Sequence, residues 1–131
     1  MVDLGQYSEI NAMSIQWESA CSDDYDIQVS SDKNNWITVK DSMATGSSLL
    51  DEYNFDEPVY GRYVRVSSHK SRTLKYGISI YEISVYGSYK DEDIAANKNA
   101  FSSTIKDLNL PTHAIDNKAN TSWISSAAGD Q

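Results

Sequence analysis

The chain has 131 residues, a formal net charge of −8 at pH 7 and a hydrophobic fraction of 40%. This length suits one domain with its own core, and the composition excludes a chain that is disordered throughout. The acidic excess argues against nucleic acid, because binding phosphate needs clustered Lys and Arg, and against an anionic membrane surface. No run reaches the roughly 20 apolar residues of a membrane span. The single cysteine, Cys21, excludes an internal disulfide.

Apolar residues recur with a period of two along most of the first 87 residues, which is typical of β-strands. Six segments are predicted as strands: 10–17, 25–30, 36–40, 51–55, 62–67 and 78–87. The turn-forming run SSDKNN between the second and third segments predicts a hairpin. No stretch of twelve or more residues shows a convincing helical period. Many short strands separated by turns predict an all-β, antiparallel sandwich or barrel.

The composition changes at residues 88–99, SYKDEDIAANKN, which are polar and poor in β-formers. They form either a surface loop of one domain or a linker between two units. The sequence beyond them contains only short strand-like pieces and is rich in Asn, Asp, Ser and Thr. Such a region keeps its shape through hydrogen bonds from side chains to the backbone, or through a bound ion.

Several motifs, taken in order, resemble the body of a discoidin domain, the coagulation-factor type C family that includes the carbohydrate-binding modules of family 32. They are VDLG, IQWESA, DYDIQVSSDKNNWITV, GRYVRV and YGISIYEISVYG. The opening motifs of the family stand at the other end of the chain, as IAANKNAFSS, HAIDNKANTSWISS and GDQ. Residues 1–88 thus resemble the C-terminal two thirds of the family and residues 89–131 its N-terminal third. The resemblance implies an antiparallel β-sandwich of the jelly-roll, galactose-binding-like class, formed by residues 1–131 as one domain in circularly permuted order.

Two histories are compatible with this order of motifs. The gene is circularly permuted, with residues 88–93 as the new linker, or the chain is cut from a tandem array of such domains. In either case we expect one sandwich that closes on itself, in preference to a domain-swapped dimer. The two chain ends should then lie beside each other in β-structure.

The segment HAIDNKANT places Asp116 and Thr121 five residues apart in a turn-forming run. Calcium takes six to eight hard oxygen ligands, so such a run suits it. The resemblance implies a structural calcium site with side-chain ligands from Asp116, Thr121 and Glu82 and carbonyl ligands from His113, Lys118 and Ile83. The alternative is an Asx-turn without metal, and Asn117 stands where the family usually has glycine. His69 and His113 lack the ligand spacing of a zinc site, so we interpret them as surface histidines.

No catalytic motif is present, so the chain is not expected to be an enzyme. Discoidin-type lectins bind sugars on loops at one end of the sandwich. The pieces WESA and YGIS resemble discoidin modules of bacterial chitosanases and glucanases, and this resemblance places Glu18 and Tyr76 in a sugar site. On the same candidate loop, Arg72, Lys70 and His69 could donate hydrogen bonds to hydroxyls. Core packing is predicted for the three tryptophans, Trp17, Trp36 and Trp123.

These features predict a non-catalytic, calcium-stabilised carbohydrate-binding module that brings a secreted or cell-surface bacterial protein to a polysaccharide. The glycan would be chitosan-like, a glucan or of galactose type, and the parent protein would carry neighbouring domains. The alternative is an adhesion or protein-interaction module of the same fold without sugar specificity. Membrane insertion is not expected, because the candidate binding loops offer no apolar side chains at their tips beyond Leu74, Leu108 and Leu110.

Overall fold

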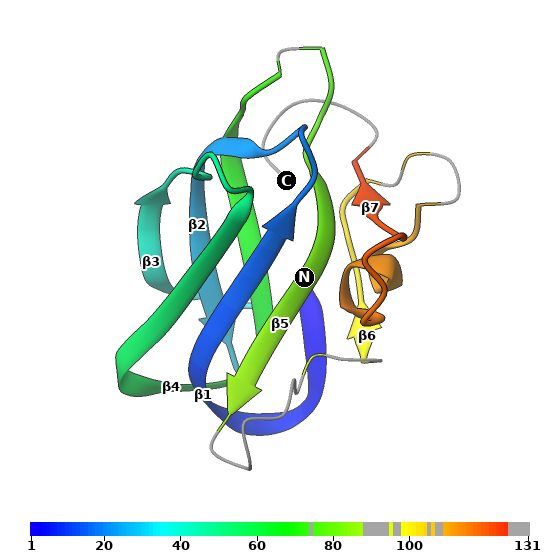
Figure 1. Ribbon diagram of the computed structural model, residues 1–131. Helices are drawn as coiled ribbons and strands as arrows, with labels where there is room; N and C mark the ends of the chain where they lie inside the picture. The colour runs from blue at the N-terminus through cyan, green and yellow to red at the C-terminus, as the bar shows by residue number, and fades with distance from the viewer. Residues whose placement is uncertain (74, 88–94, 96–97, 105, 107–108, 126–131) are drawn as a thin grey trace.

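A computed structural model describes residues 1–73, 75–87, 95, 98–104, 106 and 109–125 of the chain. Strands and one short 3₁₀ helix make up the regular structure of this part (Figure 1). The elements are β1 Val2–Trp17, β2 Ser22–Ser30, β3 Ile37–Met43, β4 Leu50–Ser71, β5 Ser79–Gly87, β6 Asn99–Ala100, η1 Pro111–Ile115 and β7 Trp123–Ile124. Within these residues, no helix has the length and apolar character needed to cross a membrane.

The strands pair in the order β3-β2-β4-β1-β5-β7, with β6 added on β1. Every pairing is antiparallel, which confirms the predicted all-β, antiparallel class. Strand β1 changes register against β4 between Asp3 and Ser8, next to Gly5, whose φ of +86° suits a residue without a Cβ. Because of this irregularity, the start of β1 pairs with β6 and its second half pairs with β5.

Strand β4 joins two segments that the sequence predicts as separate strands, 51–55 and 62–67. The break between them is a register shift: Ile10 pairs with Val59, whereas Ala12 pairs with Asn54. The intervening residues include Pro58, which cannot donate a ladder hydrogen bond. The polar break in the sequence therefore marks a bulge within a continuous strand rather than a turn.

The core lies between the long strands and the C-terminal segment. Tyr25, Ile27 and Val29 alternate inward along β2, as their period-two spacing predicts. Burial of Trp17 and Trp123 confirms the prediction of core packing for both. The prediction for Trp36 is wrong: this residue is half-buried immediately before edge strand β3, and the Arg65 guanidinium lies 4.1 Å from its ring centroid.

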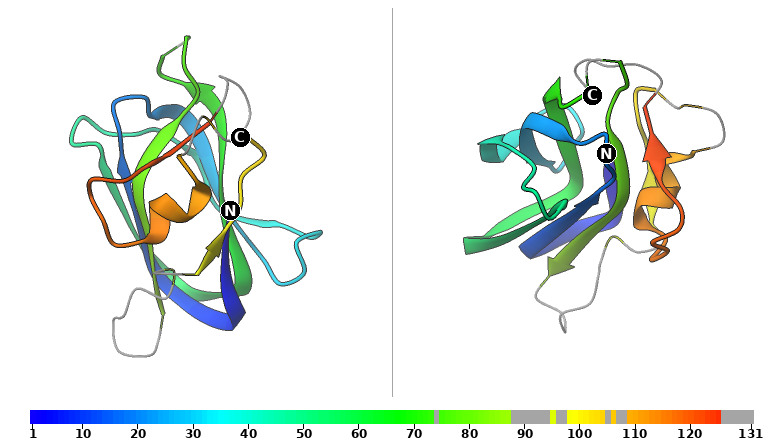
Figure 2. Two further views of the ribbon diagram at one scale, coloured as in Figure 1. Left: turned by 90° about the vertical axis from the view of Figure 1, so that its right-hand side faces the viewer. Right: turned by 45° about the horizontal axis from the view of Figure 1, so that its top comes forward.

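The C-terminal segment packs on the same body as the N-terminal strands, along β5 and the start of β1 (Figures 1 and 2). Ala100 pairs with Val2, and Trp123 pairs with Ile80. Ala114 and Ile115 of η1 belong to one buried cluster with the residues of β1, β2 and β5. A closed monomer requires this packing. Circular permutation and the meeting of the chain ends stay predictions, since the linker 88–93 and residues 126–131 lie outside the described residues.

Candidate functional site

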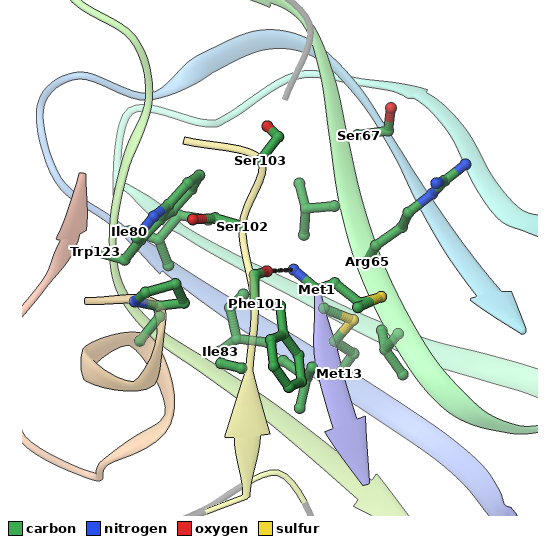
Figure 3. Close-up of a pocket in the computed structure, with 16 residues that line it drawn as sticks. Met1, Met13, Arg65, Ser67, Ile80, Ile83, Phe101, Ser102, Ser103 and Trp123 are labelled. Carbon is green, nitrogen blue, oxygen red and sulfur yellow. Dashed lines mark hydrogen bonds between the residues drawn. The ribbon is translucent and has the colours of Figure 1, made fainter. Parts of the chain in front are cut away.

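The structure contains a cavity of about 550 Å³ between the long strands and the C-terminal segment (Figure 3). Its lining is mainly apolar, with Met13, Ile80, Ile83, Phe101 and Trp123 among its walls. Of the site residues predicted from the sequence, Ile83 alone lines this cavity.

A second pocket, of about 520 Å³, lies where β1 ends and β5 begins. Eight of its eleven described lining residues carry a polar or charged group on the side chain. They come from the loop after β1, the loop before β5, the segment before η1 and the end of β7. The lining residues are Glu18, Ser19, Ala20, Thr73, Lys75, Tyr76, Gly77, Ser79, Lys106, Ile124 and Ser125. The structure thus brings Glu18 and Tyr76 into one pocket, and we call it the loop pocket.

Backbone hydrogen bonds hold the floor of the loop pocket. The N–H of Glu18 donates to the carbonyl of Ser79 at 3.1 Å, and the N–H of Ser79 donates to the carbonyl of Ala20 at 2.7 Å. On the other side, the N–H of Ile78 donates to Oγ of Ser125 at 3.0 Å, and the N–H of Ser125 returns a bond of 3.1 Å to the Ile78 carbonyl. Two chain segments distant in sequence are thereby fixed on either side of residues 78–79, which gives the pocket a rigid frame.

Tyr76 is 50% exposed, so its ring is available to a ligand rather than packed in the core. Two ammonium groups flank it: Nζ of Lys75 and Nζ of Lys106 each lie 5.5 Å from the ring centroid, within cation–π distance. The position of Lys106 is supported by its own N–H, which donates to the carbonyl of Ile124 at 2.9 Å. The Tyr76 ring is therefore a partly exposed aromatic surface with positive charge beside it.

The carboxylate of Glu18 is held by its own loop. It accepts hydrogen bonds from the hydroxyl of Ser19 and from the N–H of Ala20, the latter at 3.1 Å. Partial burial of this carboxyl group favours its neutral form, but the hydrogen bonds from Ser19 and Ala20 outweigh that effect and lower the pKa of Glu18. Glu18 is therefore ionised at neutral pH, with an oriented carboxylate at the edge of the pocket.

The other predicted ligand-binding residues, Arg72, His69 and Lys70, do not line the loop pocket. Arg72 donates to Asp23 at 2.8 Å, and His69 lies 3.0 Å from Asp26. Lys70 is exposed.

Two residues that do line the pocket, Lys75 and Lys106, were not identified from the sequence. Lys75 precedes Tyr76 directly in the sequence, and this adjacency could have indicated that Lys75 lies near the same pocket. The family resemblance places the loop 102–112, which contains Lys106, at the sugar-binding end of the sandwich, but no local motif marks Lys106 itself.

Oxygen atoms gather around the hydroxyl of Thr121 in the predicted metal loop. Its Oγ1 lies 2.9 Å from each carboxylate oxygen of Asp116, 3.0 Å from the carbonyl of Lys118 and 3.5 Å from the carbonyl of His113. Asn117 adopts a φ of 58°, the left-handed conformation that asparagine tolerates. The N–H of Lys118 donates to Asp116 at 3.0 Å and closes an Asx-turn. The structure thus brings four of the predicted calcium ligands together.

The two remaining predicted ligands, Glu82 and Ile83, lie on β5, which packs against η1. Both carboxylate oxygens of Glu82 are buried. No group of three or more His, Cys, Asp and Glu side chains that could hold a metal ion occurs in the described ranges. A cation at this loop would therefore depend on the Thr121 hydroxyl and on backbone carbonyls as well as on carboxylates, as calcium does in proteins.

Three similar solved structures support the fold. Chitosan-binding module 2 of a chitosanase/glucanase from Paenibacillus sp. IK-5, solved in complex with chitotriose, is 34% identical with a TM-score of 0.59; the match covers 65% of this chain and 66% of that chain. Chitosan-binding module 1 of the same enzyme is 35% identical with a TM-score of 0.58, covering 65% and 64%. The Clostridium perfringens module CpGH89CBM32-6 is 22% identical with a TM-score of 0.54, covering 66% and 65%, and shows likeness of fold alone.

The chain thus matches just under two thirds of the length of these modules. No curated protein matches it. The family model for the NedA-like, galactose-binding domain, of F5/F8 type C, matches residues 1–66, which is half of the chain. Together with the antiparallel β-structure, this match shows that the chain belongs to the F5/F8 type C, discoidin-like family of galactose-binding domains.

Proposed function

We propose that the chain is a non-catalytic carbohydrate-binding module and that its glycan site is the loop pocket. One observation carries the proposal: the half-exposed ring of Tyr76 and the ionised carboxylate of Glu18 line the same pocket on a hydrogen-bonded frame. The similarity to chitosan-binding modules, one of them solved with chitotriose, supports it.

Tyr76 and Glu18 would contact different parts of a bound sugar. The C–H face of a pyranose ring stacks on Tyr76, and the free lone pairs of Glu18 accept charge-assisted hydrogen bonds from sugar hydroxyls. Glu18 is the one carboxylate among the described residues of the pocket, whereas hydrolysis of a glycosidic bond normally uses two. The site thus supports binding rather than catalysis.

A binding module of this kind serves a larger protein. We propose that it holds a secreted or cell-surface bacterial protein at a polysaccharide. The polysaccharide would be chitosan-like, a glucan or a galactose-type glycan. An open pocket buries little of an oligosaccharide, so single-module affinity is expected to be weak. Neighbouring modules in the parent protein would raise the effective affinity through avidity.

We further propose that a structural calcium ion binds at the 113–121 loop. The fit of the residues supports it: one hydroxyl proton of Thr121 faces four oxygen acceptors and can satisfy only one of them well. A cation relieves the repulsion among the remaining oxygens. Asp116, Thr121 and the carbonyls of His113 and Lys118 would hold the ion, with Glu82 and the Ile83 carbonyl from β5.

Titration of the protein with chitotriose, cellotriose and a galactose trisaccharide, followed by NMR or calorimetry, tests the glycan site. We expect saturable binding to at least one of them, lost in Tyr76→Ala and weakened at least tenfold in Glu18→Ala. Tyr60→Ala is the matched control, because Tyr60 is 49% exposed and lies outside the pocket. Absence of binding to every saccharide, or equal loss in the Tyr60 variant, would overturn the assignment and favour the protein-interaction alternative.

A further inference from the structure

We infer that the loop pocket selects acidic saccharides, those containing uronic acids, over the cationic glucosamine oligomers bound by the similar modules. This inference rests on the proposed glycan site and names its ligand class. It depends on the charges around Tyr76.

The described lining residues of the loop pocket carry one negative charge and two positive charges. The negative charge is on Glu18, whose carboxylate accepts hydrogen bonds from the hydroxyl of Ser19 and the N–H of Ala20. The positive charges are the ammonium groups of Lys75 and Lys106. No carboxylate is recorded within ion-pair distance of either lysine among the described parts of the chain. The charge balance of the described lining is therefore positive, although the whole chain carries a net charge of −8.

Both ammonium groups lie close to the ring on which we propose that a sugar stacks. Each is 5.5 Å from the centroid of the Tyr76 ring, so a pyranose stacked on that ring is within reach of both flexible side chains. A uronate places its carboxylate at the edge of the pyranose ring, where lysine can form a charge-assisted hydrogen bond. A glucosamine ammonium in the same place meets two like charges.

Two other basic side chains, Arg72 and His69, do not change this balance. Arg72 is paired with Asp23, and His69 lies against Asp26. Each therefore has a negative partner of its own and adds no net positive charge to the pocket. The overall charge of −8 repels a polyanion at a distance, but salt screens exposed charges beyond roughly 8 Å at physiological ionic strength. Short oligosaccharides, which contact only the pocket, should therefore report the local preference.

The test uses two pairs of trisaccharides, and the members of each pair differ only at C6. Cellotriose and its C6-oxidised triuronate form one pair, galactotriose and trigalacturonate form another, and chitotriose at pH 6 is the cationic comparison. Dissociation constants are measured by calorimetry at 150 mM salt for the unmodified chain, Lys75→Gln, Lys106→Gln and the double variant. Lys40→Gln is the control, because Lys40 lies on β3 and does not line the pocket.

We expect one uronate to bind about fivefold more tightly than its neutral partner, the sum of two exposed ion pairs. The double Lys→Gln variant should bring the ratio of uronate to neutral-sugar affinity to about one, and Lys40→Gln should keep the ratio of the unmodified chain. If chitotriose or a neutral trisaccharide binds as tightly as both uronates, the inference is wrong and the glycan site stands. If no saccharide binds to the folded, unmodified chain, the assignment of the glycan site is wrong and this inference is wrong with it.

Discussion

The carboxylate of Asp51 accepts a hydrogen bond of 2.8 Å from the indole nitrogen of Trp17. The same oxygen accepts a bond of 2.7 Å from the hydroxyl of Tyr25. Both rings are fully buried, with centroids 5.1 Å apart. Burial, together with the hydrogen bonds to Tyr53 and Asp51, raises the pKa of Tyr25 far above its usual range. One carboxylate from β4 therefore satisfies two buried donors from β1 and β2.

Asp51→Ala should lower the free energy of unfolding by about 1–3 kcal/mol, because it leaves the buried N–H of Trp17 without its acceptor and the Tyr25 hydroxyl with Tyr53 as its remaining partner. Asp51→Asn keeps an acceptor oxygen and should cost less. Urea unfolding followed by tryptophan fluorescence measures both. Asp41→Ala, an exposed aspartate on β3, is the control and should stay within about 0.5 kcal/mol of the unmodified chain. Equal stability of the Asp51→Ala and Asp41→Ala variants would contradict this account.

Gly61 lies where β4 passes close to β2. A Cβ at this position would lie 2.3 Å from Cγ1 of Val29 and 3.0 Å from the carbonyl oxygen of Ser30. Gly61→Ala should therefore overpack the core and lower the free energy of unfolding by about 1–3 kcal/mol. Gly46→Ala is the matched control, since its Cβ would have no neighbour closer than 3.8 Å. Similar melting temperatures for the two alanine variants would contradict the packing argument.

The strands could be predicted from the sequence because their inward residues alternate. Tyr25, Ile27 and Val29 show this pattern, and all three are buried. The position of Trp36 could not be predicted in the same way, because its hydrophobicity gives no sign that β3 is an edge strand. Whether a large side chain is covered depends on its neighbours in space, and those are set by strand order.

The candidate site shows the same limit. Glu18 and Tyr76 could be identified from local motifs, and the structure places both in one pocket. Arg72 was expected to contact a ligand, but the sequence does not reveal that Asp23 of β2 lies within 2.8 Å of it. Lys106, which is 30 positions after Tyr76 in the sequence, places its ammonium group near the Tyr76 ring. Contacts made across the fold decide which charges remain available to a ligand.

The Asp3–Arg62 pair should contribute stability that depends on pH. Arg62 donates to both carboxylate oxygens of Asp3, at 2.7 Å and 3.0 Å. These bonds lower the pKa of Asp3; burial opposes them, and the N–H of Gly5 adds to them. A depressed folded-state pKa gives stability that is present above the unfolded pKa of about 3.9 and is lost as pH falls through the folded value.

Asp3→Asn should therefore be less stable than the unmodified chain at pH 7, by roughly 1 kcal/mol because the Arg62 side chain is 41% exposed. The difference should shrink as the pH is lowered below 4. Thermal unfolding at pH 7, 4 and 3 measures it. Asp41→Asn is again the control. A stability difference that stays constant over this range would show that Asp3 acts through packing alone.

Calcium removal gives the last prediction, because the 113–121 loop has more acceptors than donors around Thr121. Calcium at 100 times its dissociation constant should stabilise the chain by about 2.7 kcal/mol over the chelated form. The melting temperature should therefore rise with calcium and fall again with excess chelator. Asp116→Asn should abolish the rise, whereas Asp41→Asn should keep it.

Melting temperatures measured in chelator distinguish a calcium site from an Asx-turn that binds no metal. Asparagine at position 116 can still accept the bond from the N–H of Lys118, so the turn survives the substitution. It also removes a negative charge from a cluster of crowded oxygens. In chelator, Asp116→Asn should therefore be at least as stable as the unmodified chain, and only calcium should reverse their order. If calcium leaves both melting temperatures unchanged, the oxygens around Thr121 are held by hydrogen bonds alone and the metal site does not exist.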